Sequence, residues 1–363
     1  SIYGVKEFPL CKLGVVKHLL TSDNIGSEHV VINKNRYHLM FDNNNLGNLK
    51  NLLIAKCNNK NVVIDMEESD HPVIRYARNK YLKQEKTMNR IHTSESVTSG
   101  HPDKIADIIS DSILDECLKQ DKSSRTAVEV MLTKGKVLIA GEVTTKGNID
   151  YIAIARKVIK DIGYDINDID FECRIHTQSK DIAQAVNKEE QGAGDQGIMY
   201  GYATDETLSY MPLSITLAHR LTSRLEECRK EGIIQGILPD GKAQVSVEYM
   251  KDRLHRIKSV VVSSQHTEDK DFEHLKLEIK KHVIDHVFQD LTLDEETEVL
   301  INPSGRFVEG GFDADTGLTG RKIIVDTYGG VAHHGGGAFS GKDCSKVDRS
   351  GAYMARYIAK NIV

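Results

Sequence analysis

Residues 93–119 read TSESVTSGHPDKIADIISDSILDECLK, and the second half of this stretch sets the fold around it. Apolar residues recur there at the spacing of one helix face: Ile105, Ile108, Ile109, Ile113, Leu114 and Leu118. Pro102 suits the first turn, where a backbone N–H has no partner inside the helix. The pattern predicts an amphipathic helix over 102–119, preceded by a loop at 94–101 that is the place for chemistry.

Strand and helix patterns interleave downstream of this helix. Lys134-Gly135 separates two apolar runs and predicts a hairpin, while Gly163 is typical of a helix end. Strands are expected at 126–132, 136–144, 244–249, 257–263 and 322–327, and helices at 152–162, 213–230 and 275–288. This order predicts an α+β fold whose sheets are covered on one face by helices.

The composition bounds the class of protein. Of 363 residues, 39% are hydrophobic and 28% charged, which fits a globular chain and excludes collagen-like, coiled-coil and fully disordered classes. With 48 Lys+Arg against 53 Asp+Glu, the net charge of -5 leaves no general footprint for nucleic acid. The sequence contains no run of about 18 apolar residues, so no membrane-spanning helix is expected. Six cysteines without a C-x-x-C pair argue against a zinc ribbon or a secreted disulfide scaffold, so we expect a cytoplasmic protein.

The first 87 residues differ in character from the rest. They hold 12 of the 18 asparagines and a net charge of +4, whereas the remainder carries -9. Short apolar runs at 14–20, 30–31, 52–55 and 62–65 suit buried strands or helices, and the Asn-rich tracts between them suit loops. The boundary near Met88 predicts that residues 1–87 are an extension of unassigned role joined to a different sequence.

Two glycine-rich segments match nucleotide motifs imperfectly. Residues 192–197 fit G-x-G-x-x-G, but the polar stretch before them does not suit the strand that a dinucleotide fold needs. Residues 336–342 fit G-x-x-x-x-G-K, yet Asp343 follows where a P-loop has Ser or Thr. A P-loop-like ATPase therefore stays an alternative. Lys342 and Lys346, four residues apart on one expected helix face, add positive charge near backbone amides.

A third segment, 310–322, places acidic residues before the basic pair Arg321-Lys322. Taken alone it also suits two surface turns that lead into a strand. Together with His101 and Asp103 at the predicted helix N-terminus, the loops offer both cations for phosphate and carboxylates for a divalent metal. The basic set is Lys242, Arg321, Lys322, Lys342 and Lys346, and the acidic set is Asp103, Asp315 and Asp348. This combination favours a polyphosphate substrate held with divalent ions.

Four runs of sequence resemble the S-adenosylmethionine synthetase (methionine adenosyltransferase) family: residues 93–107, 192–204, 317–330 and 334–343. The resemblance extends in collinear order over 88–363. It implies three similar α+β domains around a pseudo-threefold axis, at 88–190, 191–308 and 309–363. It also implies a homodimer or dimer of dimers with active sites between subunits, and no nucleic-acid or membrane partner.

The activity that the resemblance implies is the synthesis of S-adenosylmethionine, phosphate and diphosphate from ATP, L-methionine and water. The methionine sulfur attacks C5′ of ATP, and the released triphosphate is then hydrolysed. A thioether sulfur has no proton to lose, so no general base is required. The cofactors implied are two Mg²⁺ per site and K⁺, which would stabilise the leaving polyanion and organise the site.

The resemblance also assigns residues by position. Catalytic roles fall to His101, Lys242, Arg321 and Lys342. The ATP site would comprise His101, Asp240, Lys242, Arg306, Phe307, Asp315, Arg321, Lys322, Ala338 and Lys342, and the methionine site Glu142, Gln178, Asp315 and Lys346. Asp103 would hold Mg²⁺ and Glu129 would hold K⁺, with Asp348 and Asp195 completing the metal and polar shell.

Two departures from the family pattern affect what is expected. Residues 175–190, at the position of the family's gate, are shorter than usual, which bears on methionine affinity. The chain ends at 361–363 where the family continues, so an incomplete third domain and weak activity are expected. A catalytically silent fragment or partner subunit of an intact synthetase is the second reading, although such subunits usually lose the active-site residues that are present here.

Overall fold

The computed structural model describes residues 25–32, 35–42, 52–57, 60–65, 89–177, 192–250 and 253–363. The chain divides into two compact units, 1–89 and 90–363. In the first unit, four antiparallel strands form a sheet in sequential order: β1 (Ile25–Ile32), β2 (Asn35–Asp42), β3 (Leu52–Cys57) and β4 (Lys60–Asp65). The apolar runs at 30–31, 52–55 and 62–65 lie in these strands, and the run at 14–20 is outside the described residues.

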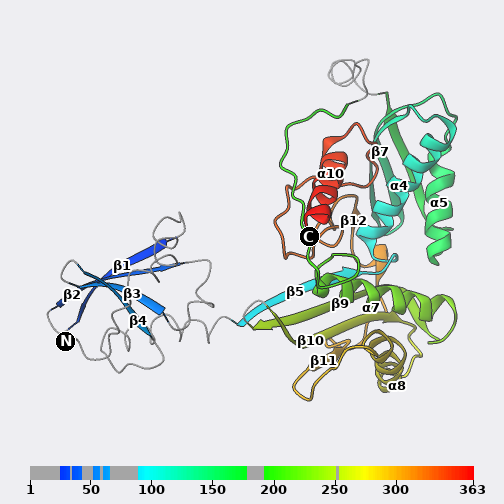
Figure 1. The fold of residues 1–363 in the computed structure, drawn as a ribbon. Coiled ribbons are helices and arrows are strands. Elements are labelled where there is room, and N and C mark those ends of the chain that lie inside the picture. Colours follow the sequence, from blue (N-terminus) through cyan, green and yellow to red (C-terminus); the bar gives the residue numbers. More distant parts are fainter. Residues whose placement is uncertain are drawn as a thin grey trace. The chain divides into compact units, whose positions relative to one another are not determined.

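The second unit contains a sheet built on the predicted hairpin (Figure 1). Its strand order is β12 (Gly317–Leu318), β6 (Arg125–Thr133), β7 (Lys136–Thr144) and β8 (Asp170–His176). Strands β6 and β7 pair antiparallel through a turn in which Gly135 has φ +69°, a conformation that favours glycine. The hairpin prediction is confirmed, and β8 adds to β7 in parallel.

Helices α4 (Pro102–Gln120) and α5 (Tyr151–Ile162) cover one face of this sheet. Alternate residues of β6 are buried against them, and the predicted apolar stripe of α4 forms the other side of the core. Gly163 caps α5 in the left-handed conformation, as its position predicted. The other face of the sheet carries half-buried and exposed side chains.

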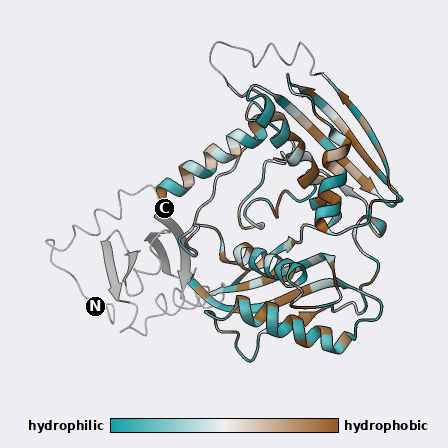
Figure 2. Cartoon of the chain, turned by 90° about the vertical axis from the view of Figure 1, so that its right-hand side faces the viewer, coloured by the Kyte–Doolittle hydropathy of each residue, from teal (hydrophilic) through white to brown (hydrophobic). Residues whose placement is uncertain are grey.

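A second sheet has the order β11 (Glu298–Ile301), β10 (Arg253–His266), β9 (Ile237–Met250) and β5 (Asn89–Val97). Its core is shared with α7 (Leu213–Lys230), α8 (Phe272–Ile279), a π-helical turn at Lys280–Ile284 and α9 (Asp285–Val287). Figure 2 shows hydrophobic and hydrophilic residues alternating along these elements. The predicted helices at 213–230 and 275–288 and the strands at 244–249 and 257–263 are confirmed, and the α+β class with them.

Residues 309–363 add the short strand β12 and the helix α10 (Val347–Ile362). No residue of α10 is buried, but Arg356 anchors it by donating hydrogen bonds to the carbonyls of Tyr202, Ser209 and Tyr210. Within the described ranges, no helix is both long and apolar enough to cross a membrane.

The prediction of a strand at 322–327 is wrong. Residues 323–330 form consecutive turns, in which the Asp326 N–H donates to the Lys322 carbonyl at 2.9 Å and the Gly329 N–H to the Ile324 carbonyl at 3.1 Å. The β-branched run Ile323-Ile324-Val325 favours a strand locally, but ion pairs from α4 hold both ends of this segment in a turn. With no strand here, the P-loop-like interpretation of 336–342 loses its required context.

Two smaller expectations also need correction. Residues 94–97 continue β5, so the loop before α4 is only 98–101. Lys342 and Lys346 do not share a helix face, because α10 begins at Val347 and both lysines lie in the preceding loop.

Candidate active site

His101 occupies the N-cap position of α4, at the positive end of the helix dipole, where negative charge is favoured. Its Nδ1 accepts a hydrogen bond from the Asp103 N–H at 3.2 Å. Burial, together with the nearby charges of Lys322 and Lys242, lowers the pKa of His101 to about 4. The imidazole is therefore neutral at neutral pH. Since Nδ1 is an acceptor, its proton lies on Nε2, which makes that atom a hydrogen-bond donor.

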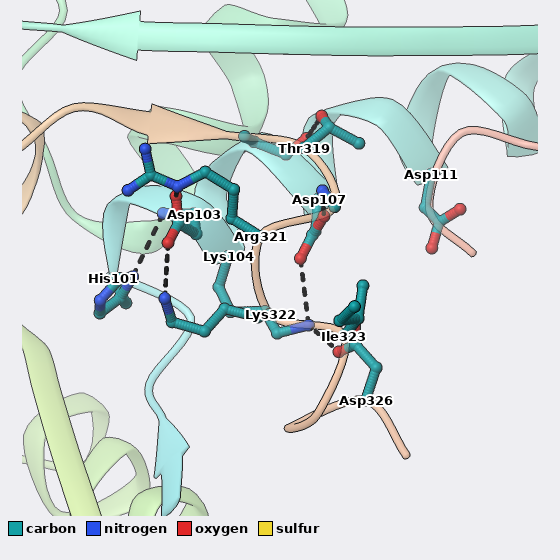
Figure 3. A network of polar contacts seen from close by, with 12 residues as sticks. His101, Asp103, Lys104, Asp107, Asp111, Thr319, Arg321, Lys322, Ile323 and Asp326 are labelled. Atoms are coloured by element: carbon teal, nitrogen blue, oxygen red, sulfur yellow. Dashed lines mark hydrogen bonds and ion pairs between the residues drawn. The ribbon is translucent and has the colours of Figure 1, made fainter. Parts of the chain in front are cut away.

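Asp103 is buried one residue into the helix and is surrounded by donors (Figure 3). One carboxylate oxygen accepts a hydrogen bond from the Leu318 N–H at 3.0 Å and forms an ion pair with Nε of Arg321 at 3.0 Å, and the other accepts from Nζ of Lys322 at 2.5 Å. Burial opposes ionisation, but the hydrogen bonds from Lys322 and Leu318 and the charges of Lys322 and Arg321 outweigh it and lower the pKa of Asp103. The side chain is a carboxylate that gathers two cations.

The loop that carries these cations lies along α4. Asp107, one turn beyond Asp103, accepts from the Gly320 N–H at 2.9 Å, and Ser110 hydrogen-bonds Thr319 at 2.7 Å. Gly317 allows the close approach, because a Cβ there would lie 2.3 Å from the Pro102 carbonyl oxygen. The segment from β12 to Lys322 is thus fixed on the first turns of the helix.

Asp240 and Lys242 approach the same place from β9. Asp240 is buried and accepts from the Gly311 N–H at 2.9 Å, while its Oδ1 is buried with no hydrogen-bond partner among the described residues. Burial raises the pKa of Asp240, against the effect of the Gly311 hydrogen bond and Lys242. Lys242 and Asp315 both act on the pKa of His101. An unpaired buried acceptor beside exposed cations is suited to a polar ligand.

Phe307 and Arg306 lie next to this group. The Phe307 backbone exchanges two hydrogen bonds with His266, and its ring packs beside Gly310, where a Cβ would meet it at 2.9 Å. Arg306 is exposed and forms an ion pair with Glu268.

Lys342 and Lys346 form a separate basic pair on the edge of β6. Lys342 bridges Ala127 of that strand, and its Nζ lies 2.7 Å from Asp348. Lys346 pairs with Asp343 at 3.0 Å. Ala338 connects the two regions, because it packs on Gly320, where a Cβ would lie 2.7 Å from the Ala338 methyl group.

The remaining predicted residues are not part of this cluster. Glu129 and Glu142 lie on the face of the β6–β7 sheet opposite the helices, where Glu142 contacts His176 at 3.1 Å and Glu129 is exposed. No hydrogen bond or ion pair within the described ranges joins either one to His101. Asp195 is exposed and bonds its neighbour Gln196. Gln178 and most of the 175–190 segment lie outside the described residues.

An acidic row on α4 was missed from the sequence. Asp103, Asp107 and Asp111 follow each other at one-turn intervals, and Asp111 accepts from the Gly341 N–H at 3.0 Å and from Arg349 at 2.9 Å. The spacing of four was the available signal. The row fixes both the 317–322 loop and the 341–349 loop, so it aligns the two basic regions on one helix.

The cluster can bind a highly charged anion and donate a hydrogen bond from a neutral imidazole. Among the described residues, no three His, Cys, Asp or Glu side chains gather in a way that could hold a metal by themselves. A buried carboxylate next to exposed cations still fits Mg²⁺, which is usually held by one or two carboxylates and a substrate's phosphates.

The comparisons with known proteins agree on one family over residues 89–363. Three family models match: the S-adenosylmethionine synthetase N-terminal domain over 89–189, the central domain over 190–307 and the C-terminal domain over 309–363. Relatives named S-adenosylmethionine synthase include those of Staphylococcus epidermidis (53% identity over 295 residues, 76% of this chain and 74% of the relative) and Finegoldia magna (52% over 290, 75% and 74%). That of Thermus thermophilus is 53% identical over 295 residues, 76% of this chain and 75% of the relative.

Proposed function

The chain belongs to the S-adenosylmethionine synthetase family, and we propose that its reaction takes place at the cluster around His101 and Asp103. Its activity is that of a methionine adenosyltransferase. The sulfur of methionine attacks C5′ of ATP and displaces triphosphate, which water then cleaves to diphosphate and phosphate. The family is metal-dependent, and its substrates are ATP and L-methionine.

Arg321, Lys322 and Lys242 are assigned to the triphosphate. Breaking the bond to C5′ leaves a polyanion, so cations placed before the reaction lower its barrier. Two of these cations are held ready by Asp103, at 3.0 Å and 2.5 Å. Lys342 is assigned to the same phosphates from the neighbouring loop, where Asp348 now pairs with it.

His101 is assigned a donor's role rather than a base's. Its pKa near 4 keeps the imidazole neutral, and the Asp103 N–H occupies Nδ1. The Nε2–H is then available to the triphosphate oxygen that leaves C5′. A base has nothing to do in this step, because the attacking thioether carries no proton.

Asp103, with Asp348 in the metal shell, would hold Mg²⁺ once phosphate oxygens supply further ligands. When bound, this ion neutralises charge on the triphosphate. Glu129 is assigned to K⁺ on the strength of the resemblance and its exposed carboxylate.

The rest of the ATP would lie along Asp240, Asp315, Phe307, Arg306 and Ala338. The Oδ1 of Asp240, which no described residue hydrogen-bonds, suits a hydroxyl donor such as a ribose supplies. Glu142, Gln178, Asp315 and Lys346 are assigned to methionine.

We infer a homodimer, or a dimer of such dimers, from the position of the two glutamates. Glu129 and Glu142 lie on the open face of their sheet, away from the His101 cluster of the same chain. A second copy packed on that face would bring its own cluster toward them and complete two sites. We place the enzyme in the cytoplasm, where thiols such as the buried Cys117 and Cys228 stay reduced.

The observation that carries this proposal is the Asp103–Arg321–Lys322 cluster beside a neutral His101, in a chain about half identical to named synthases. The test is to incubate the purified chain with ATP, methionine, Mg²⁺ and K⁺ and to detect the sulfonium product by mass spectrometry. The wild-type chain is expected to form S-adenosylmethionine with equal amounts of phosphate and diphosphate. The Lys342→Ala variant is expected to lose this activity. ATP hydrolysis that does not need methionine would contradict the proposal.

A further inference from the structure

A partly buried charged group lies beside the residues assigned to phosphate and takes no part in the chemistry assigned above. Lys104, in the first turn of α4, forms ion pairs with Asp107 at 3.1 Å and with Asp326 (Figure 3). The side chains of Lys104 and Asp326 are 19% and 16% exposed, and that of Asp107 is 4% exposed. One cation is therefore shared by two carboxylates in a largely dry place.

The two carboxylates hold opposite ends of one short segment, residues 320–326, which we term the phosphate arm. Asp107 accepts from the Gly320 N–H at 2.9 Å, directly before Arg321. At the other end, the Asp326 N–H donates to the Lys322 carbonyl at 2.9 Å. Fixing Gly320 and Asp326 therefore fixes the backbone on both sides of the two cationic residues.

These contacts differ from those of Asp103 in one respect. Asp103 holds the arm partly through the side chains of Arg321 and Lys322. Those two side chains are the ones expected to turn toward phosphate, and their bonds to Asp103 weaken when they do. Lys104, Asp107 and Asp326 use neither side chain, so their contacts do not have to break when those side chains turn.

We propose that Lys104, through Asp326 and Asp107, is a positioning residue that holds the phosphate arm in place for the triphosphate. It is not a group that touches substrate. Without its charge, the buried Asp107 and the partly buried Asp326 lose the cation that they share, and the arm moves off α4 to hydrate them. The inference rests on the proposed function, because it assigns Arg321 and Lys322 to phosphate.

The decisive variant is Lys104→Met, which keeps much of the side-chain length and removes the charge. Calorimetry with inorganic tripolyphosphate is expected to show affinity lowered by about 10- to 100-fold, in line with misplacing binding groups by about 1 Å. The KM for ATP is expected to rise by a similar factor, with the KM for methionine within about twofold of wild type. A merely structural role would lower the amount of folded enzyme without this split.

Matched variants distinguish a displaced phosphate arm from a general loss of stability. Lys104→Arg keeps the charge and is expected to restore most of the affinity. Lys119→Met removes an exposed lysine from the other end of α4, where it pairs with Glu116, and is expected to bind like wild type. If Lys104→Met does not fold, Asp326→Asn carries the test, because it removes one charge and keeps a hydrogen-bonding side chain of the same size.

The inference fails if folded Lys104→Met or Asp326→Asn binds tripolyphosphate as wild type does, or if both substrates are weakened equally. Failure of the proposed function looks different, since wild-type protein itself would then make no S-adenosylmethionine. The calorimetric measurement needs no turnover, so the two outcomes are read independently.

Discussion

The ammonium group of Lys322 lies 2.5 Å from the carboxylate of Asp103, although 219 positions of sequence separate them. Arg321 shares the same carboxylate at 3.0 Å. One buried acidic side chain at a helix start therefore gathers two cations from a distant loop. The same carboxylate is the one assigned to Mg²⁺, so the proposal gives it a part in both the assembly of the cluster and turnover.

Replacing Asp103 by Asn is expected to lower kcat/KM by about 100-fold or more, because the site loses the charge that orients the cations and that the proposal assigns to Mg²⁺. The Mg²⁺ concentration for half-maximal rate should also rise. Steady-state kinetics over a magnesium series provides the measurement. Asp161→Asn, which removes an exposed carboxylate paired with Lys157, is the control and should match wild type.

The depressed pKa of His101 predicts a pH-dependent stability. In the folded chain this pKa is about 4, against 6.5 for the free side chain, so between these values the unfolded state binds more protons. The free energy of unfolding should fall as pH drops from 6.5 to 4, by roughly 3 kcal/mol from this group. Urea denaturation at several pH values measures it. In His101→Asn, the free energy of unfolding should depend less steeply on pH between 4 and 6.5. An unchanged pH dependence would contradict the lowered pKa of His101.

Gly317→Ala is expected to destabilise the second unit by about 1–3 kcal/mol, since the new methyl group would overlap the Pro102 carbonyl. Thermal unfolding should show a melting temperature lower by several degrees, of the order of 2–4 °C per kcal/mol. Gly192→Ala is the matched control, because no atom of the described residues, its chain neighbours aside, lies within 4 Å of its added carbon. Equal melting temperatures for the two variants would mean that β12 is not held tightly on α4.

Arg356→Met is expected to loosen α10, which has no buried residue and relies on guanidinium bonds to the 202–210 loop. Amide hydrogen exchange in α10 should accelerate at least tenfold, because local opening then costs at least about 1.4 kcal/mol less. Asn361→Ala, at the exposed end of the same helix, should leave the exchange of its central turns unchanged. Slow exchange in Arg356→Met would show that other contacts secure the helix.

Met131→Lys tests the inferred dimer surface. Met131 is 39% exposed on the open face of β6, and a charge there should separate the copies by disfavouring burial of that face. Sedimentation velocity is expected to show monomers and a parallel loss of turnover. Leu277→Lys makes a similar change on α8, where the side chain is 68% exposed, and should leave the oligomer intact. Dimers that survive Met131→Lys would place the interface elsewhere.

The elements that sequence predicted well are those with strong periodicity or punctuation. The helix at 213–230 coincides with α7, and Gly135 and Gly163 stand where a turn and a helix end require glycine. The family resemblance named the cations and carboxylates of the cluster. Periodicity alone could not show that residues 322–327 form turns, because the bonds that override their β-branched character come from α4, more than 200 positions earlier.

The same limit applies to the site. Lys104 and Asp107 look like ordinary solvated charges of an amphipathic helix until their partners are known. Glu129 and Glu142 follow the alternation of side chains along β6 and β7. Which face of these strands the helices leave uncovered depends on where α4 and α5 pack. These are facts of tertiary packing, which one sequence does not encode locally.

The acidic row of α4 also has a consequence for how the protein is made. Asp103, Asp107 and Asp111 find their partners 213 to 238 residues further along the chain. At about 5–20 residues per second, a ribosome needs roughly 10–50 s to add that many residues. During this interval the helix can form its core with the β6–β7 hairpin, yet its three carboxylates stay in water. The cluster around His101 therefore cannot be completed before residues 317–322 have been synthesised, whereas α4 and the β6–β7 hairpin are available much earlier.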